Sequence, residues 1–96
     1  DTNHLVVLDQ EGRLSGIITT YDLSKAIARP GKAKQVRDIM TTKVITTSPD
    51  EHVDIVARKL EQYNVSALPV VGPENRVLGM LTAIDLGKLF GGRWLK

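Results

Sequence analysis

Two short motifs in this sequence combine residue types that can bind a polar ligand. Thr82 and Asp85 lie three positions apart, and Thr19 and Asp22 repeat the pattern 63 positions earlier. A carboxylate can accept hydrogen bonds from both hydroxyls of a ribose. The free N–H groups and the positive dipole end of a helix N-terminus suit phosphate or carboxylate. Each motif therefore indicates a binding site for a sugar or an anion, provided that it opens a helix.

The same pattern also has a purely local interpretation. A Thr at the N-cap with an acidic residue three positions later is a variant of the capping box, in which the two residues exchange hydrogen bonds between side chain and backbone. Capping alone explains most single Thr-x-x-Asp motifs. Two copies at matched positions, each after a glycine-bearing strand, favour a binding role as well. The two roles are compatible.

Both motifs belong to a longer internal repeat. Residues 4–27 align without gaps on residues 67–90, and nine of the 24 positions are identical, which indicates two copies of one supersecondary unit. Each copy predicts a strand, a tight turn, a second strand and a helix. The predicted strands are residues 5–8 and 13–19 in the first copy, and residues 68–71 and 76–82 in the second.

Four positions define the predicted hairpins. The turns end on Gly12 and Asn75, both of which tolerate positive φ. The second strands carry Gly16 and Gly79 in mid-strand, where glycine costs stability and marks a bulge or a close approach by another group.

The segment between the copies predicts a further strand and further helices. Residues 28–31 contain Pro30 and end the first helix, residues 33–40 predict a short helix, and residues 44–47 a strand. Ser48 as N-cap, with Glu51 closing a capping box, predicts the start of a longer helix. Its predicted apolar face consists of Val53, Val56, Ala57 and Leu60.

This segment has no counterpart in front of the first copy. Shifted back by 63 positions it falls before Asp1, so we expect the first copy to lack its opening strand and helix and the chain to be part of a longer protein.

The composition restricts the class of protein. A chain of 96 residues with 42% hydrophobic and 25% charged residues fits one compact soluble domain that gains stability by association. Its net charge of +2, spread along the chain, does not indicate a nucleic-acid surface. Without cysteine or a long apolar run, we expect a cytoplasmic protein with no disulfide and no membrane span. No nucleophile–base pair or metal-ligand spacing is apparent, so we expect neither catalysis nor a metal site.

The sequence resembles the CBS domain, which is named for cystathionine β-synthase and occurs in tandem pairs called Bateman modules. Residues 65–90 resemble the family's signature closely, and residues 37–65 resemble its opening half. On this basis residues 1–30 form the C-terminal half of a first repeat, and residues 31–96 a second repeat with a C-terminal tail. The sequence is especially similar to those of archaeal CBS pairs that resemble sensors of S-adenosylmethionine or methylthioadenosine.

The resemblance implies an α/β fold. Two pseudo-symmetric repeats, each strand-helix-strand-strand-helix on a small mixed sheet, would pack sheet to sheet with ligand clefts between them, and two pairs would form a disc-like homodimer. It also implies a regulatory module that binds an adenosine-containing small molecule and is not an enzyme, and we expect no cofactor. The main alternative is a module of the same fold that dimerises its parent protein and binds no ligand.

The family's binding positions carry over to both motifs. Asp85 with Thr82, and Asp22 with Thr19, match the residues that hold the ribose and lie by the phosphate or its equivalent. The adenine slot carries over to Met40, Lys43, Ile45, Val65, Ser66, Ala67 and Pro69.

One pair of positions separates the two predicted sites. His4 matches Ala67, at a place where basic residues of some family members contact phosphates. His4 is therefore a candidate contact for an anion, with a purely structural role as the alternative. Ala67 cannot bind phosphate, which favours AMP, S-adenosylmethionine or methylthioadenosine over ADP or ATP at the second site.

Overall fold

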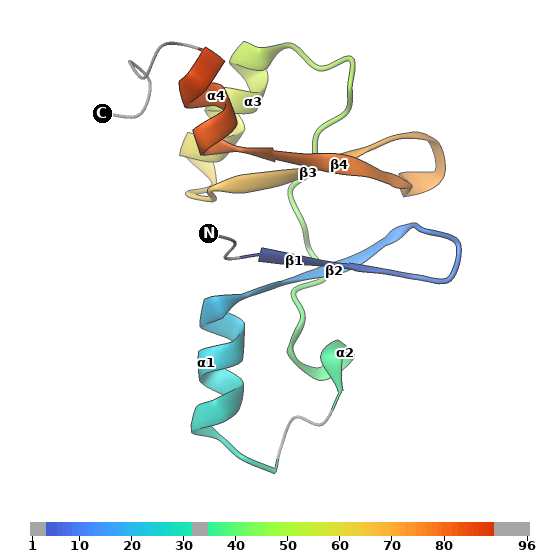
Figure 1. Cartoon of the computed structure of the whole chain (residues 1–96), viewed down its shortest axis with the longest axis vertical. Helices are drawn as coiled ribbons and strands as arrows, with labels where there is room; N and C mark the ends of the chain where they lie inside the picture. The colour runs from blue at the N-terminus through green and yellow to red at the C-terminus, as the bar shows by residue number, and fades with distance from the viewer. Residues whose placement is uncertain (1–3, 32–34, 90–96) are drawn as a thin grey trace. The chain divides into compact units, whose positions relative to one another are not determined.

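The computed structural model describes residues 4–31 and 35–89, which form two compact units that divide between Val44 and Ile45 (Figure 1). The first unit contains the strands β1 (His4–Leu8) and β2 (Leu14–Thr19) and the helices α1 (Thr20–Ala28) and α2 (Val36–Ile39). The second contains α3 (Val53–Gln62), β3 (Ala67–Val71), the 3₁₀ turn η1 (Pro73–Asn75), β4 (Val77–Thr82) and α4 (Ala83–Leu89).

Each unit is built on one antiparallel hairpin, β1 with β2 and β3 with β4. The registers are equivalent, because Val7 lies opposite Gly16 in the first hairpin and Val70 opposite Gly79 in the second. The pairing register shifts between Val7 and Leu8 in the first hairpin and between Val70 and Val71 in the second. Each mid-strand glycine therefore stands beside a β-bulge, as the sequence predicted.

The two hairpin turns adopt the predicted conformation at their last residue. Gly12 has φ 80° and Asn75 has φ 63°, so both use the left-handed region. In the first turn the Asp9 carboxylate fixes the loop, since its Oδ1 accepts hydrogen bonds from the N–H groups of Glu11 (2.9 Å) and Arg13 (2.8 Å). The hydrogen bond from the backbone N–H of Arg13 is the main cause that lowers the pKa of Asp9.

The segment before α3 differs from the sequence prediction. Residues 44–47 do not form a strand, and only Thr47 makes a bridge, a parallel one to Val70 that turns the β3–β4 sheet into a small mixed sheet. The helix begins at Val53, with His52 as N-cap through a hydrogen bond from Asp54 N–H to its Nδ1 (3.2 Å). The predicted start at Ser48 is therefore wrong.

The reason lies in the partners of Glu51. Its Oε1 accepts hydrogen bonds from Thr47 Oγ1 and Lys59 Nζ, both at 2.7 Å, instead of closing a capping box at Ser48. The N–H of Glu51 makes only a turn bond to the carbonyl of Ser48 (3.1 Å).

The core of the second unit forms where α3 and α4 pack over the sheet. Its buried members are Val56, Leu60, Leu68 and Leu86, and Ile45, Val53, Ala57, Val65, Leu81 and Ala83 pack against them. The predicted apolar face of α3 is therefore confirmed. In the first unit, Ile17 and Ile18 of β2 are buried.

Met40 and Thr41, which precede this segment, contact strand β2 of the first unit. Thr41 forms an antiparallel bridge to Ile17, with N–H···O bonds of 2.9 Å in both directions. Met40 lies so close to β2 that a Cβ atom on Gly16 would stand 2.8 Å from its sulfur. The close approach predicted at the mid-strand glycine is thus present in this hairpin.

The division of the duplicated sequence into residues 1–30 and 31–96 stays a prediction, since compact units need not follow repeat boundaries. The predicted tail, residues 91–96, lies outside the described residues.

Candidate functional site

The second motif joins the end of β4 to the start of α4. The N–H of Thr82 donates to Asp85 Oδ2 (3.0 Å), and the N–H of Asp85 donates to Thr82 Oγ1 (3.1 Å), which are the two bonds of a capping box. The hydrogen bond from the Thr82 N–H is the main cause that lowers the pKa of Asp85. The exposed carboxylate is therefore ionised at neutral pH and acts only as an acceptor.

The first motif makes the same box between β2 and α1. Asp22 Oδ2 accepts from the N–H (2.9 Å) and the hydroxyl (3.1 Å) of Thr19, and the N–H of Asp22 donates to Thr19 Oγ1 (3.2 Å). Asp22 is only 8% exposed. Both motifs therefore cap their helices, and Asp85 is the more accessible of the two carboxylates.

The hairpins place the expected neighbours beside each motif. In the second unit Ala67 lies opposite Thr82, and the carbonyl of Ser66 accepts a hydrogen bond from the N–H of Ala83 (2.9 Å). Pro69 follows two residues along β3 and is buried. In the first unit His4 lies opposite Thr19. Ser66, Ala67, Thr82 and Asp85 thus come together at one end of the β3–β4 hairpin.

The remaining predicted residues divide between the two units. Ile45 and Val65 lie in the second unit and pack against its core cluster. Met40 and Lys43 lie in the first unit, where Met40 packs against Gly16 and Lys43 is exposed. The contacts within each unit therefore give Ile45, Val65 and Met40 a packing role, and their part in an adenine slot stays a prediction.

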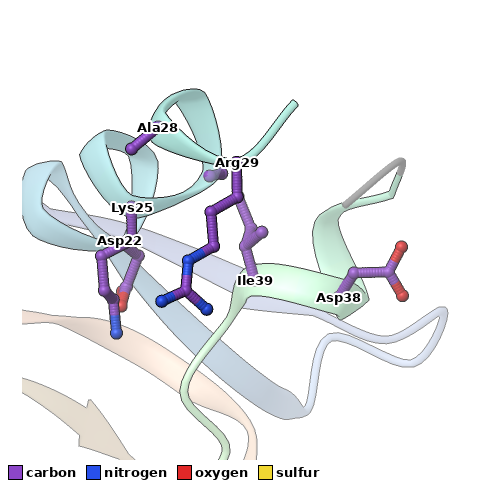
Figure 2. Close-up of a pocket in the computed structure, with 7 residues that line it drawn as sticks. Asp22, Lys25, Ala28, Arg29, Asp38 and Ile39 are labelled. Atoms are coloured by element: carbon purple, nitrogen blue, oxygen red, sulfur yellow. The ribbon is translucent and has the colours of Figure 1, made fainter. Parts of the chain in front are cut away.

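A hollow of about 550 Å³ lies beside Asp22 in the first unit, between α1 and α2. Its other lining residues are Lys25, Ala26, Ala28, Arg29, Asp38 and Ile39. Figure 2 shows the Arg29 side chain beside Ile39 and the Asp38 carboxylate pointing away from both. Sequence reasoning missed this group, although the recurrence of Lys25 as Lys88 was a signal for one member. Met40 lines a second hollow, of about 710 Å³.

Within the described residues, no group of three or more His, Cys, Asp or Glu side chains is placed to hold a metal ion. Over residues 4–31 and 35–89, no helix has the length and apolar character needed to cross a membrane.

The chain belongs to the CBS domain family, because residues 1–29 and 36–91 match the family's model. Its mixed α/β architecture of small sheets and helices agrees with that of solved CBS domain pairs. A CBS domain pair solved in complex with 5′-methylthioadenosine and S-adenosyl-L-methionine is 47% identical, with a TM-score of 0.82. The similarity covers 95% of this chain and 72% of that one.

Curated relatives place the same segment in larger proteins. The chain is 47% identical over 91 residues to an L-aspartate semialdehyde sulfurtransferase of Methanocaldococcus jannaschii. It is 41% identical over 88 residues to a homoserine O-acetyltransferase of Methanococcoides burtonii. The matches cover 95% and 92% of this chain but only 18% of each relative. The two enzyme names thus belong to proteins several times longer than the shared segment.

Proposed function

We propose that this chain is a regulatory module that binds an adenosine-containing small molecule and carries no catalytic residues of its own. The observation that carries the proposal is the exposed, ionised Asp85 at the start of α4, held in place by Thr82. The similarity to a CBS pair solved with two adenosine derivatives supports the same class of ligand.

Capping and ligand binding can share one carboxylate. An ionised carboxylate has about four acceptor positions, of which the capping box uses one or two. The remaining positions of Asp85 can accept the two hydroxyls of a ribose, which fixes the orientation of the sugar. In the proposal, Ser66, Ala67 and Pro69 lie along the ligand, and Ile45, Val65, Met40 and Lys43 contribute to the adenine slot.

The first motif offers a second, less accessible site. Asp22 and Thr19 would take the roles of Asp85 and Thr82, and His4, opposite Thr19, would meet the anionic part of a ligand. Because Asp22 is nearly buried and two of its hydrogen bonds go to Thr19, we expect this site to bind more weakly in the 96-residue chain.

The side chains beside Thr82 favour a ligand with little negative charge. Ala67 lies opposite Thr82 and offers neither a charge nor a hydrogen-bond donor from its side chain. A triphosphate would gain no cation from the side chain of Ala67, whereas the sulfonium of S-adenosylmethionine and the thioether of methylthioadenosine need none. We therefore rank these two ligands first, AMP next, and ADP and ATP last.

Regulation requires that the ligand bind two arrangements of the protein unequally. A coupling of about 1–3 kcal/mol is typical and enough to change the state of an attached domain.

The proposal also includes a cytoplasmic location and a homodimer of CBS pairs. Light scattering of the purified protein would measure its mass and so test the homodimer.

A thermal-shift screen tests the proposal. A ligand present at 100 times its dissociation constant stabilises the folded state by about 2.7 kcal/mol. We expect S-adenosylmethionine or methylthioadenosine to raise the melting temperature clearly, and ATP to raise it least. If none of the adenosine compounds changes the melting temperature, the alternative of a ligand-free dimerisation module replaces the proposal.

A further inference from the structure

The hollow between α1 and α2 is large enough to hold part of a small ligand. Its volume is about 550 Å³, and ligand pockets in proteins commonly measure about 300–1,000 Å³. Its lining combines apolar side chains with four charged ones, from Asp22, Lys25, Arg29 and Asp38 (Figure 2). All of them belong to the first unit, so the hollow lies within one compact body.

Asp22 offers this hollow one hydrogen-bond acceptor. Its Oδ2 accepts both hydrogen bonds that Thr19 donates to the carboxylate. No described residue donates to its Oδ1, and Oδ1 is not among the fully buried side-chain atoms that lack a partner. Oδ1 is therefore open to solvent, although Asp22 as a whole is only 8% exposed. Because Asp22 lines the hollow, a hydroxyl group of a ligand bound there can donate to Oδ1 while Oδ2 serves the cap.

Two cations line the same hollow. Lys25 and Arg29 follow Asp22 by three and seven positions, a spacing that places side chains on one face of a helix. Lys25 Nζ lies 4.6 Å from the centre of the Tyr21 ring. Among the described residues, neither cation forms an ion pair with a carboxylate. The Asp38 carboxylate points away from Arg29 and accepts a main-chain N–H of its own turn (Figure 2).

We propose, on the basis of the proposed function, that this hollow holds the anionic end of an adenosine ligand whose ribose meets Asp22. Lys25 and Arg29 then make the first site select a ligand that carries a carboxylate or a phosphate. A ribose hydroxyl donates to Asp22 Oδ1, and the anionic group lies further along α1 against the two cations. A guanidinium binds either kind of anion through two parallel hydrogen bonds, which a neutral ligand end cannot accept in the same way.

The second motif has only part of this arrangement. Lys25 recurs as Lys88, but the position 63 residues after Arg29 is Gly92, which has no side chain. Two ligand ends therefore separate the sites. The first site should favour AMP and S-adenosylmethionine, which carry a phosphate and a carboxylate, over methylthioadenosine, which carries neither. The second site should show no such preference for an anion.

NMR titration of the 96-residue chain measures the two sites separately. The backbone amides of Lys25 and Ile39 report on the first site, and those of Ala83 and Asp85 on the second. At the first site we expect AMP and S-adenosylmethionine to bind about 10-fold more tightly than methylthioadenosine, since a charge-assisted hydrogen bond is weakened but not abolished by solvent. Equal affinities of all three compounds for the first site would overturn the proposal.

Replacing single cations tests which side chain meets the anion. Arg29→Gln should weaken AMP at the first site about 10-fold and leave methylthioadenosine unchanged. Arg37→Gln is the matched control and should bind like the wild type, because Arg37 is an exposed arginine of the same unit that does not line this hollow.

Two outcomes separate this proposal from the proposed function. If His4→Gln weakens AMP at the first site and Arg29→Gln does not, the anion lies by His4, which overturns the role of the hollow and leaves the proposed function standing. If none of the three compounds shifts an amide of either unit, the proposed function fails and the hollow loses its ligand with it.

Discussion

Glu51 links α3 to the sheet of the second unit, and replacing its side chain should lower the free energy of unfolding of this unit. Its Oε1 accepts hydrogen bonds from Thr47 Oγ1 and Lys59 Nζ, both at 2.7 Å. Lys59 Nζ also donates to the carbonyl of Thr46 (2.9 Å), and the main chain of Thr47 bonds to Pro69 and Val71 of β3. The carboxylate therefore joins the helix to the segment that extends the sheet.

The cost of Glu51→Ala follows from what it leaves behind. Thr47 is 4% exposed, and its hydroxyl would retain only a long contact to the carbonyl of Ser48 (3.4 Å). Lys59, whose side chain is 27% exposed, would keep its hydrogen bond to the carbonyl of Thr46. A hydrogen bond to a charged group contributes about 1.5–3 kcal/mol. Because solvent screens this partly exposed pair, we expect a loss of about 2 kcal/mol, or about 10 °C in melting temperature.

The effect should also depend on pH. The hydrogen bonds from Lys59, and then from Thr47, hold the pKa of Glu51 below its usual 4.5. A carboxyl group whose pKa is lower in the folded state stabilises that state above the unfolded pKa, and this contribution is lost as pH falls through the folded pKa. The difference between wild type and Glu51→Ala should therefore be full at pH 7 and narrow progressively below about pH 4.5.

Urea unfolding of the wild type and two variants, from pH 7 to pH 3, measures this difference. Glu61→Ala is the matched control, because Glu61 is a glutamate of α3, the helix that Glu51 contacts through Lys59, is exposed, and has no side-chain partner among the described residues. If Glu51→Ala is no less stable than Glu61→Ala at pH 7, or if the difference does not change with pH, the carboxylate does not hold the helix to the sheet.

Two further predictions compare equivalent positions of the repeats in the 96-residue chain. Leu86→Ala should cost about 2–5 kcal/mol of unfolding free energy because it leaves a cavity in the core, whereas Leu23→Ala should cost less than about 1.5 kcal/mol; equal losses in urea unfolding would contradict the core assignment. Gly12→Ala should cost about 1–2 kcal/mol of unfolding free energy, because φ of Gly12 is 80° although no described atom lies within 4 Å of an added Cβ. Asn75→Gly should change the unfolding free energy by less than about 1 kcal/mol. Thermal unfolding of both variants checks this, and a Gly12→Ala variant as stable as the wild type would refute the strain argument.

The hairpins were predictable because local chemistry determines them. The glycine or asparagine at the end of each turn takes a positive φ, and the register slips beside each mid-strand glycine. The duplication strengthened these predictions, since each feature occurs twice. The capping boxes followed for the same reason, because both of their bonds join residues three positions apart.

The start of α3 was not predictable from local pattern. The sequence before it contains the residues of a capping box, but Glu51 is taken by Lys59, eight residues away. Thr47 is likewise held by Pro69 and Val71 rather than by neighbours in a strand of its own. Contacts between distant residues overrode the local preference in both cases.

The candidate site was predictable in part. Sequence identity between the repeats pointed to Thr82 and Asp85, and the hairpin brings Ser66 and Ala67 beside them. Apolar residues carry no such signal, because Ile45 and Val65 have the same character whether they line a ligand or fill the core against which they pack. Their binding role stays a prediction until a ligand is located.

Calorimetric titration of S-adenosylmethionine and methylthioadenosine into the wild type, Asp85→Asn and Asp50→Asn tests the central claim most directly. An asparagine at position 85 can still accept from the Thr82 N–H, so the cap remains while the charged acceptor for the ribose is lost. Asp50→Asn removes the same charge from an exposed turn. We predict that Asp85→Asn binds about 10- to 100-fold more weakly and that Asp50→Asn binds like the wild type. Equal affinities for all three folded proteins would show that Asp85 only caps its helix.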